Sequence, residues 1–332
     1  MKKFVAILAA TTAALALVGC ADQGLDTEKN SITVYAGRSE SLVQPLIDNF
    51  VAETGIEVEV RYAGSAELAA QILEEGQNSP ADVFFAQDSG ALGAVAKAGL
   101  LVDLPASILE QVPASYSAVA GNWVGVSGRV RVFNYNPEKV SVVPSSVFDL
   151  ADSSWQGRVG IAPTNASFQA FVTAMRVLEG DDKTLAWLKA MKINAVIYEK
   201  NSAILEAVES GEVDSGLINH YYWFARGKEL GFENLTSVLG QFDSSDVGNL
   251  INAAGVGIIQ DSQAARDFVE YLLSETGQLY FAEETSEYPL IDLVDAGLDL
   301  TPLSDIPSPE IDLSDLDSLD QTLELIREAG LI

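Results

Sequence analysis

The hydrophobic positions from residue 31 onward alternate between strand-like and helix-like spacing. Short runs rich in β-branched and aromatic residues occur at 32–35, 56–62 and 82–85. Between them, residues 42–53 and 65–75 place apolar side chains three and four positions apart, as in a helix with one buried face. This strand–helix–strand–helix–strand order predicts a mostly parallel sheet flanked by helices.

A second group of elements predicts another lobe of the same α/β class. Strands are expected near 125–135, 159–162 and 195–198, helices near 168–178, 184–191 and 203–209, then a strand at 254–259 and helices at 263–274 and 318–328. In the first lobe, the loops 36–40 and 86–90 follow predicted parallel strands. Ligands bind beyond the carboxyl ends of such strands, so these loops are candidate walls of a cleft.

The N-terminal segment predicts export. Lys2 and Lys3 precede the apolar stretch 4–18, which is short for a membrane-spanning helix. The sequence Leu17-Val18-Gly19-Cys20 resembles the bacterial lipobox, where the signal is cut before a cysteine that receives lipid. Cys20 is the only cysteine, so no disulfide can form within the chain. An ordinary signal peptide that ends near a cysteine is the alternative; we expect a lipid anchor at Cys20 and a polar tether over 21–30.

The charge balance excludes some partners. The chain has 19 Lys and Arg against 48 Asp and Glu, a net charge of −29, and removal of the export signal makes it more negative. Such a surface repels nucleic acid and anionic lipid, so membrane contact is expected only through the anchor. Solubility or a saline habitat explains this acidity more simply than an acidic binding function does.

Enzyme motifs are scarce. His220 is the sole histidine, and the sequence has no Walker loop, no dinucleotide-binding glycine pattern and no HExxH pattern. Acidic pairs are abundant, but 48 acidic residues make chance pairs common. An extracytoplasmic metallohydrolase therefore stays only as a remote alternative, and we expect a binding protein rather than an enzyme.

One aromatic run, His220-Tyr221-Tyr222-Trp223-Phe224, carries the candidate chemistry. Core packing is the first interpretation of such a run. On a strand the two tyrosines would face opposite sides, but a helix predicted over 224–229 places them at its N-terminus, where neighbouring side chains can share one target. A trivalent cation can displace the phenolic protons, and anionic oxygen ligands suit a hard ion such as ferric iron.

Several segments then resemble one known family. They are ITVYAGR at 32–38, SPADVFF at 79–85, SGRVR at 127–131, NSAILEAVESGEV at 201–213, LINHYYW at 217–223 and IREAGL at 326–331. Together they resemble the bacterial ferric-ion-binding proteins, the transferrin-like receptors of iron ABC importers. The resemblance implies an α/β, two-lobed periplasmic-binding-protein fold of type II, with a hinge between lobes. Its cargo would be Fe(3+) with a synergistic anion, carbonate or similar, delivered by a monomer to an ABC permease.

The resemblance also implies site residues. Tyr221 and Tyr222 match the consecutive tyrosine ligands of the family, and Tyr135 matches a third tyrosine that some branches add. Two expected first-lobe ligands are missing, because Ser39 stands where some branches have histidine and Gln87 stands where an acidic ligand is expected. The site is therefore expected to depend on tyrosines and an added anion, with Gln87 and Asp88 surrounding it.

For the anion, Arg38 is the candidate cation, since its planar fork suits a bidentate oxyanion; an ordinary surface salt bridge is the equal alternative. Thr164, Asn165, Ala166 and Asn219 match anion-holding positions of the family, whereas His220 is expected to be structural.

The predicted organisation is a signal at 1–19, a lipidated tether at 20–30, and two lobes. Lobe 1 spans 31–131 and is completed by about 256–306; lobe 2 spans 132–255 and is completed by about 307–332. The mature protein is expected at the outer face of the cytoplasmic membrane, in the periplasm or on the cell surface. A binding protein for a polyamine, a phosphonate or another oxyanion is the nearest alternative, because such proteins share the lobes.

Overall fold

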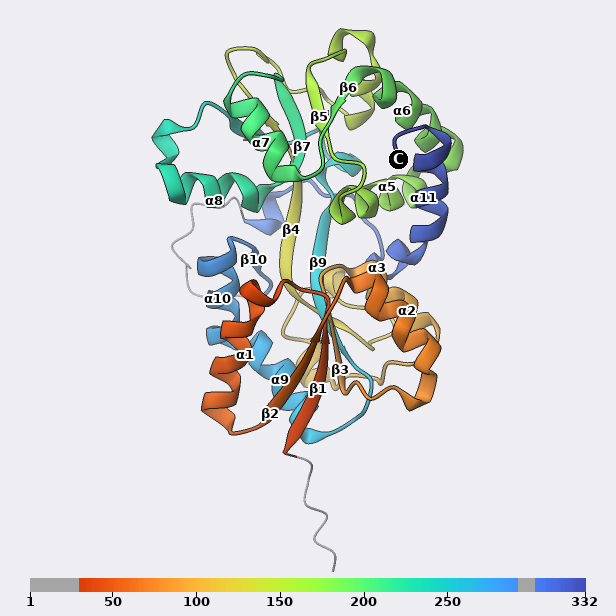
Figure 1. Ribbon diagram of the computed structural model, residues 1–332, viewed down its shortest axis with the longest axis vertical. Helices are drawn as coiled ribbons and strands as arrows, with labels where there is room; N and C mark the ends of the chain where they lie inside the picture. The colour runs from red at the N-terminus through yellow and green to blue at the C-terminus, as the bar shows by residue number, and fades with distance from the viewer. Residues whose placement is uncertain (1–29, 292–301) are drawn as a thin grey trace, which may run out of the picture.

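The computed structural model describes residues 30–291 and 302–332. Two lobes lie one above the other along the long axis, and two long strands run between them (Figure 1). These are β4 (Val124–Tyr135) and β9 (Ile251–Ile258), which pair antiparallel. The predicted export signal and Cys20 lie outside the described residues. The two-lobed α/β architecture is as predicted.

Lobe 1 is built around three parallel strands. The strand β1 (Ser31–Ala36) lies between β2 (Glu57–Tyr62) and β3 (Val83–Ala86), and β9 extends the sheet antiparallel to β3. The helices of this lobe are α1 (Glu40–Thr54), α2 (Ser65–Glu75), α3 (Ser89–Lys97), the short α4 (Ala106–Leu109), α9 (Gln263–Leu273) and α10 (Glu275–Thr285). Every residue of β3 is buried, as expected for a strand covered on both faces.

Lobe 2 repeats this arrangement. Its parallel strands are β7 (Ser215–Asn219), β5 (Val159–Ile161) and β6 (Ala195–Ile197), with β4 antiparallel to β7 and the short β8 (Val238–Gly240) also on β4. The helices are α5 (Ala166–Glu179), α6 (Asp181–Asn194), α7 (Asn201–Glu209) and α8 (His220–Leu230). The chain order places the N-termini of α5, α7 and α8 just after strand ends that face lobe 1 (Figure 1).

The two sheets meet on β4. Up to Val130 this strand pairs with β9, and from Arg131 it pairs with β7. The change of partner marks the passage from one lobe to the other, beside the predicted boundary at residue 131. The two-residue β10 (Tyr288–Pro289) pairs with β4 at Ser127 and Gly128, on the lobe 1 side.

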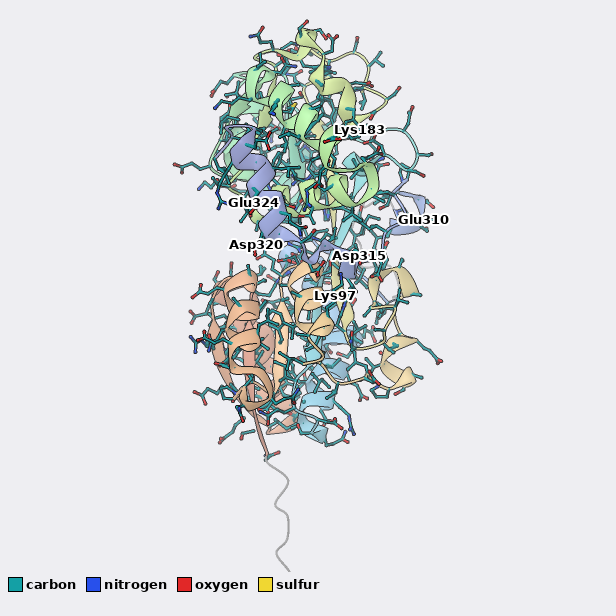
Figure 2. All side chains as sticks on the ribbon, turned by 90° about the vertical axis from the view of Figure 1, so that its right-hand side faces the viewer. Lys97, Lys183, Glu310, Asp315, Asp320 and Glu324 are labelled. Atoms are coloured by element: carbon teal, nitrogen blue, oxygen red, sulfur yellow. The ribbon has the colours of Figure 1, made fainter. Side chains whose placement is uncertain are left out.

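A third connection runs along the junction through the 3-10 helix Leu313–Asp317 and then α11 (Leu319–Glu328). The 3-10 helix packs against α3, where Gly93 leaves room for its backbone, and Lys97 pairs with Asp315 and Asp317 at 3.2 and 3.0 Å. Figure 2 shows Lys97 and Asp315 where the two lobes meet, with Asp320 and Glu324 on α11 beside lobe 2.

Several elements differ from the prediction. The helix α8 begins at His220, four residues earlier than expected, and α3, β7 and α10 are among the elements that were not predicted. β7 and α10 begin with the polar Ser215 and the charged Glu275, so the spacing of hydrophobic residues did not indicate a strand or a helix there. Among the described helices, none combines the length and the apolar composition needed to cross a membrane.

Candidate metal and anion site in the interlobe cleft

Tyr221 and Tyr222 lie side by side in the first turn of α8. Their ring centroids are 4.4 Å apart and the rings are 31° from parallel, and both side chains are half-buried. Asn219 is the last residue before the helix, and its side chain makes no capping hydrogen bond. The earlier start of α8 therefore strengthens the predicted geometry, because both tyrosines now project from helical positions beside free backbone N–H groups.

Three helix N-termini converge beside this pair. Asn165 caps α5 by accepting from the backbone N–H of Ser167 at 3.0 Å, and the Ser167 hydroxyl donates to Asn165 Oδ1 at 2.6 Å. Asn201, the first residue of α7, donates from Nδ2 to Ser167 Oγ at 3.1 Å and also interacts with the Tyr222 phenol. Helix N-termini carry partial positive charge, so this junction of α5, α7 and α8 favours anions.

Two buried arginines lie under the tyrosines on β4. Arg129 donates from Nη2 to the carbonyl of Gln87, and Arg131 donates from Nη1 to the carbonyl of Leu217 at 3.1 Å. Arg131 also lies over the rings of Phe168 and Phe171. Both are about 3% exposed or less, and neither forms an ion pair with a carboxylate in the described parts of the chain. Sequence reasoning noticed them only within SGRVR, because charged residues in a strand are ordinarily expected on its solvent face.

Burial sets the acid–base properties of this group. It raises the pKa of Tyr222, and the neighbouring Tyr221 raises it further, while Arg129 and Asn201 oppose the change. Burial also lowers the pKa of Arg131 to about 10, although the two tyrosines act to raise it. Without a cation the Tyr222 phenol therefore keeps its proton at neutral pH, and Arg131 keeps its charge.

A small cavity separates the arginines from the helix ends. It has a volume of about 10 Å³, room for one water molecule, and is lined by Arg129, Arg131, Ser167, Asn219, Leu250 and Asn252. Guanidinium groups, side-chain amides and a helix N-terminus therefore border one point, while the Ser167 hydroxyl there already donates to Asn165. Such a set is suited to an oxyanion.

The wider cleft lies next to this site, between the lobes. Its cavity of about 390 Å³ is walled by Gly37, Gln87 and Asp88 from lobe 1 and by Ala166 and Gln169 from lobe 2. Both loops that the strand order predicted as cleft walls are thus present. Asp88 also caps α3 by accepting from the Ala91 N–H at 3.1 Å, so part of its carboxylate is already used.

The structure places Arg38 in a buried ion pair and not on the surface. Its Nη2 donates to both carboxylate oxygens of Glu287 at 3.0 Å, and the two side chains are 1% and 4% exposed. The surface salt bridge considered as the alternative role is therefore wrong. The charge of Arg38 already has a protein partner, which Arg129 and Arg131 lack among the described residues. The exposed Ser39 precedes α1 and makes no side-chain cap.

Tyr135 is not brought to the tyrosine pair. It pairs with Ser215 at the start of β7, whereas the pair follows Asn219 at the other end, opposite Arg131. Four residues along a strand span about 13 Å. The Tyr135 ring stacks instead on Phe133, with centroids 5.6 Å apart. Thr164 is exposed and precedes the cap residue Asn165, while Ala166 is exposed and lines the cleft.

His220 has a structural role, as the sequence analysis expected. Its Nδ1 accepts a hydrogen bond from the Val130 N–H at 3.2 Å, and its ring lies 4.7 Å from that of Tyr288. Burial lowers its pKa to about 4, so the ring is neutral. The lone pair that could bind a metal is occupied by the backbone of the hinge strand.

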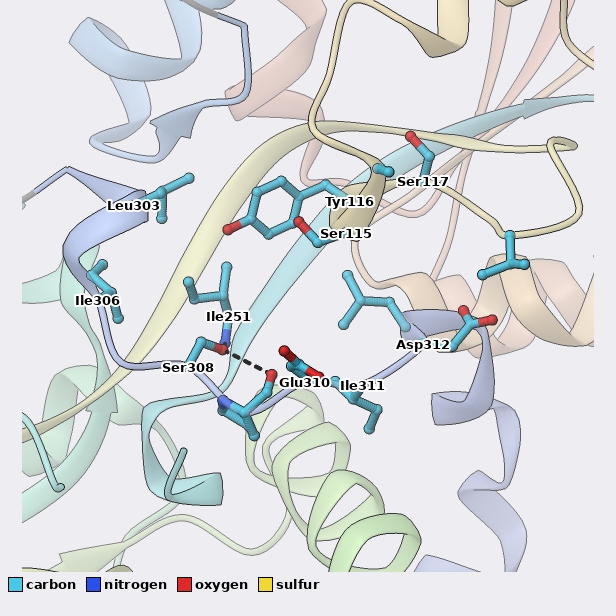
Figure 3. A pocket seen from close by; sticks show the side chains of 14 residues that line it. Ser115, Tyr116, Ser117, Ile251, Leu303, Ile306, Ser308, Glu310, Ile311 and Asp312 are labelled. Carbon is cyan, nitrogen blue, oxygen red and sulfur yellow. Dashed lines mark hydrogen bonds between the residues drawn. The ribbon is translucent and has the colours of Figure 1, made fainter. Parts of the chain in front are cut away.

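A separate cavity of about 620 Å³ lies between the loop 114–119 and the connection 303–313 (Figure 3). Ile251 and Ile306 form part of its lining, and none of the predicted site residues reaches it. In the described residues, no three or more His, Cys, Asp or Glu side chains are grouped to hold a metal ion. A metal bound by this part of the chain would therefore need other ligands, such as phenolates.

Comparisons with known proteins agree with this architecture. A family model described as bacterial extracellular solute-binding protein matches residues 32–284. The Fe(3+)-binding periplasmic protein of Serratia marcescens is 38% identical over 318 residues, which cover 94% of this chain and 92% of that protein. Iron-bound HitA from Pseudomonas aeruginosa superposes with a TM-score of 0.81 at 36% identity, covering 90% of this chain and 99% of that chain.

A further solved structure, Trichodesmium IdiA (FutA) in complex with iron and citrate, has a TM-score of 0.76 at 27% identity, with 90% of this chain and 99% of that chain covered. The relatives therefore share both the sequence and the two-lobed fold over nearly the whole chain. The chain belongs to the bacterial extracellular solute-binding proteins and groups there with the periplasmic ferric-iron-binding proteins.

Proposed function

We propose that this protein binds ferric iron together with a small anion in the interlobe cleft and delivers the iron to an ABC permease. The observation that carries the proposal is the adjacent pair Tyr221 and Tyr222 beside three helix N-termini and two buried arginines. The relatives whose names describe iron binding support the choice of metal. The protein acts as a carrier and not as an enzyme.

The two tyrosines supply the metal ligands. The Tyr222 phenol is neutral in the empty site, and a trivalent cation is the charge that can displace a phenolic proton. Anionic oxygen suits ferric iron better than it suits zinc or copper, which favour nitrogen and sulfur ligands. Selectivity then comes from the ligand type and not from a histidine or cysteine cluster.

The loaded site would have a net positive charge, which favours binding of an anion. Iron(III) with two phenolates leaves one positive charge, and Arg129 and Arg131 add two more, while Arg38 is balanced by Glu287. Buried cations without partners are costly, so a bound oxyanion stabilises the loaded site. Ser167 and Asn219 line the cavity at the arginines, and Asn165, Ala166 and Asn201 lie beside Ser167 at the starts of α5 and α7. Together they would hold that anion by amide, hydroxyl and backbone donors. Carbonate or a small carboxylate fits this description.

Closure of the lobes would complete the site. Gln87 and Asp88 come from lobe 1 and the tyrosines from lobe 2, so a loaded cleft gains contacts only when both walls meet. The permease would then recognise the closed, loaded form of a monomer. The hinge strands β4 and β9 carry this motion.

A binding protein for an oxyanion alone is the second candidate, since the arginines and helix N-termini favour any oxyanion. The same positive charges disfavour a polyamine, despite the two aromatic faces that could contact a cation. Isothermal titration of the mature protein separates these functions. Iron(III) with bicarbonate should bind tightly and spermidine should not; phosphate or phosphonate that bound without iron, and equally well after Tyr221→Phe, would identify an oxyanion carrier.

Export and lipidation remain part of the proposal, supported by the apolar N-terminal stretch and by the position of Cys20. A lipid on Cys20 would hold the acidic protein at the outer face of the cytoplasmic membrane. Cys20→Ser should release the protein into the soluble fraction of expressing cells and remove the lipid mass from its N-terminal peptide. Recovery of the wild type with an unmodified Cys20 would refute the anchor.

A further inference from the structure

A continuous set of buried polar side chains follows the hinge strand. Ser127, Arg129 and Arg131 are alternate residues of β4, so they lie on one face, and each is at most 3% exposed. Ser127 and Arg129 lie where β4 pairs with β9 in lobe 1, and Arg131 lies where it pairs with β7 in lobe 2. This polar face leads from the core of lobe 1 to the tyrosine pair.

Glu287 is a carboxylate within this set. It lies between α10 and β10 and is 3% exposed. It accepts from Arg38 Nη2 through both oxygens and from the Ser127 hydroxyl. Burial alone would raise the pKa of Glu287, but the charges of Arg38 and Arg129 and the hydrogen bonds outweigh it, so the pKa is lowered. Glu287 is therefore ionised at neutral pH.

Several donors of Arg38, Arg129 and Arg131 have no hydrogen-bond partner among the described residues. They are Nε and Nη1 of Arg38, Nε of Arg129 and Nη2 of Arg131. A group of three buried guanidiniums with one carboxylate thus keeps both spare positive charge and spare donors. Arg129 is close enough to act electrostatically on Glu287 and on Tyr222, so it connects the carboxylate to the metal site.

We propose that Glu287 is a specificity-determining residue that sets which anion is accepted with the metal. Its single negative charge reduces the charge of the arginine group from three to two. The affinity for an anion bound at Arg129 and Arg131 depends on this total charge, and the dependence is stronger for a more highly charged anion. The inference rests on the proposed function, because it concerns the anion partner of iron.

The expected size follows from Coulomb's law. One unit charge about 10 Å away, at an effective dielectric constant near 20, changes the affinity for each further anion charge by about tenfold. Removal of Glu287 should therefore favour a trianion such as citrate over bicarbonate by at least this factor. Removal of Arg38 lowers the total charge by one and should shift the preference the other way.

The experiment compares iron(III) affinity in citrate and in bicarbonate at one pH for the wild type and a set of variants. We expect the citrate-to-bicarbonate ratio to rise about tenfold or more in Glu287→Gln, to fall about tenfold or more in Arg38→Gln, and to return near the wild-type value in the double variant. Glu75→Gln is the matched control, since Glu75 is also a hydrogen-bonded carboxylate of lobe 1 but lies at the far end of α2 from the cleft. Its ratio should equal that of the wild type.

A purely structural role would move both single variants in the same direction or leave the ratio unchanged, and either result would overturn the proposal. If Glu287→Gln does not fold by circular dichroism, the sign of the Arg38→Gln shift decides. Failure of the proposed function looks different, because the wild type itself would then bind no iron with either anion.

Discussion

Arg131 on β4 lies directly opposite Asn219 on β7, the residue after which the chain turns into α8 and presents its two tyrosines. This pairing places a buried guanidinium beneath the two tyrosines that we propose as metal ligands. It also fixes the point where β4 passes from one lobe to the other. The proposed binding site and the strand that joins the lobes therefore share Arg131, which would give cargo binding a direct physical route to lobe closure.

The tyrosine pair gives the first prediction. Tyr221→Phe and Tyr222→Phe each remove a phenolate ligand, and each should weaken iron(III) binding more than about hundredfold. Loss of a residue that only hydrogen-bonds to a metal ligand already lowers metal affinity by about 10- to 100-fold. Tyr135→Phe is the matched control, because Tyr135 stacks on Phe133 at the other end of β7. Competition with a chelator of known affinity measures all three. A large loss of iron(III) affinity in Tyr135→Phe would instead identify Tyr135 as a ligand.

Proton release is the second prediction. Because burial raises the pKa of Tyr222, its phenol is protonated near neutrality, and iron must displace that proton when it binds. Affinity should therefore fall as pH falls, by about one order of magnitude per pH unit for each phenolic proton released. Calorimetry in buffers of different ionisation enthalpy, with oxalate as an anion that does not titrate near pH 7, counts the protons. A pH-independent affinity contradicts phenolate binding.

The third prediction concerns the anion. Arg131→Gln removes a buried charge beside the donor-lined cavity, and iron affinity in bicarbonate should fall about 10- to 100-fold. The dependence of binding on bicarbonate concentration should weaken with it. Arg266 pairs with Asp261 on the surface, so Arg266→Gln should change neither quantity. An Arg131→Gln protein with unchanged bicarbonate dependence would place the anion elsewhere.

The fourth prediction concerns the 3-10 helix Leu313–Asp317, whose backbone packs closely against Gly93 of α3. A Cβ on Gly93 would lie 2.3 Å from the carbonyl oxygen of Ser314, and the backbone there cannot move aside like a side-chain tip. Gly93→Ala should lower the free energy of unfolding by about 1–3 kcal/mol. Gly64→Ala has open space around its Cβ and should cost less, under about 1 kcal/mol, from the preference for Gly over Ala at a helix N-cap. Denaturant unfolding of both variants tests this.

The sequence predicted most of the scaffold because helical and strand periods are local properties. Both lobes, the cleft loops after β1 and β3, and the helical placement of Tyr221 and Tyr222 follow from spacing alone. Strand register is not local, so Tyr135 could be assigned to the site although β4 carries it about four residues past Arg131. Arg129, Arg131 and Glu287 were missed for a related reason: charged residues are expected at the surface, and only tertiary contacts reveal a buried charged group.

A visible titration tests the central claim most directly. Phenolate bound to iron(III) produces a charge-transfer colour that neutral tyrosine and carboxylate-bound iron do not. The mature protein, titrated with iron(III) in bicarbonate, should develop this band and reach its maximum at one equivalent, and the Tyr221→Phe/Tyr222→Phe protein should remain colourless. A wild type that binds iron without the band, or a double variant that keeps it, would contradict iron binding by this tyrosine pair.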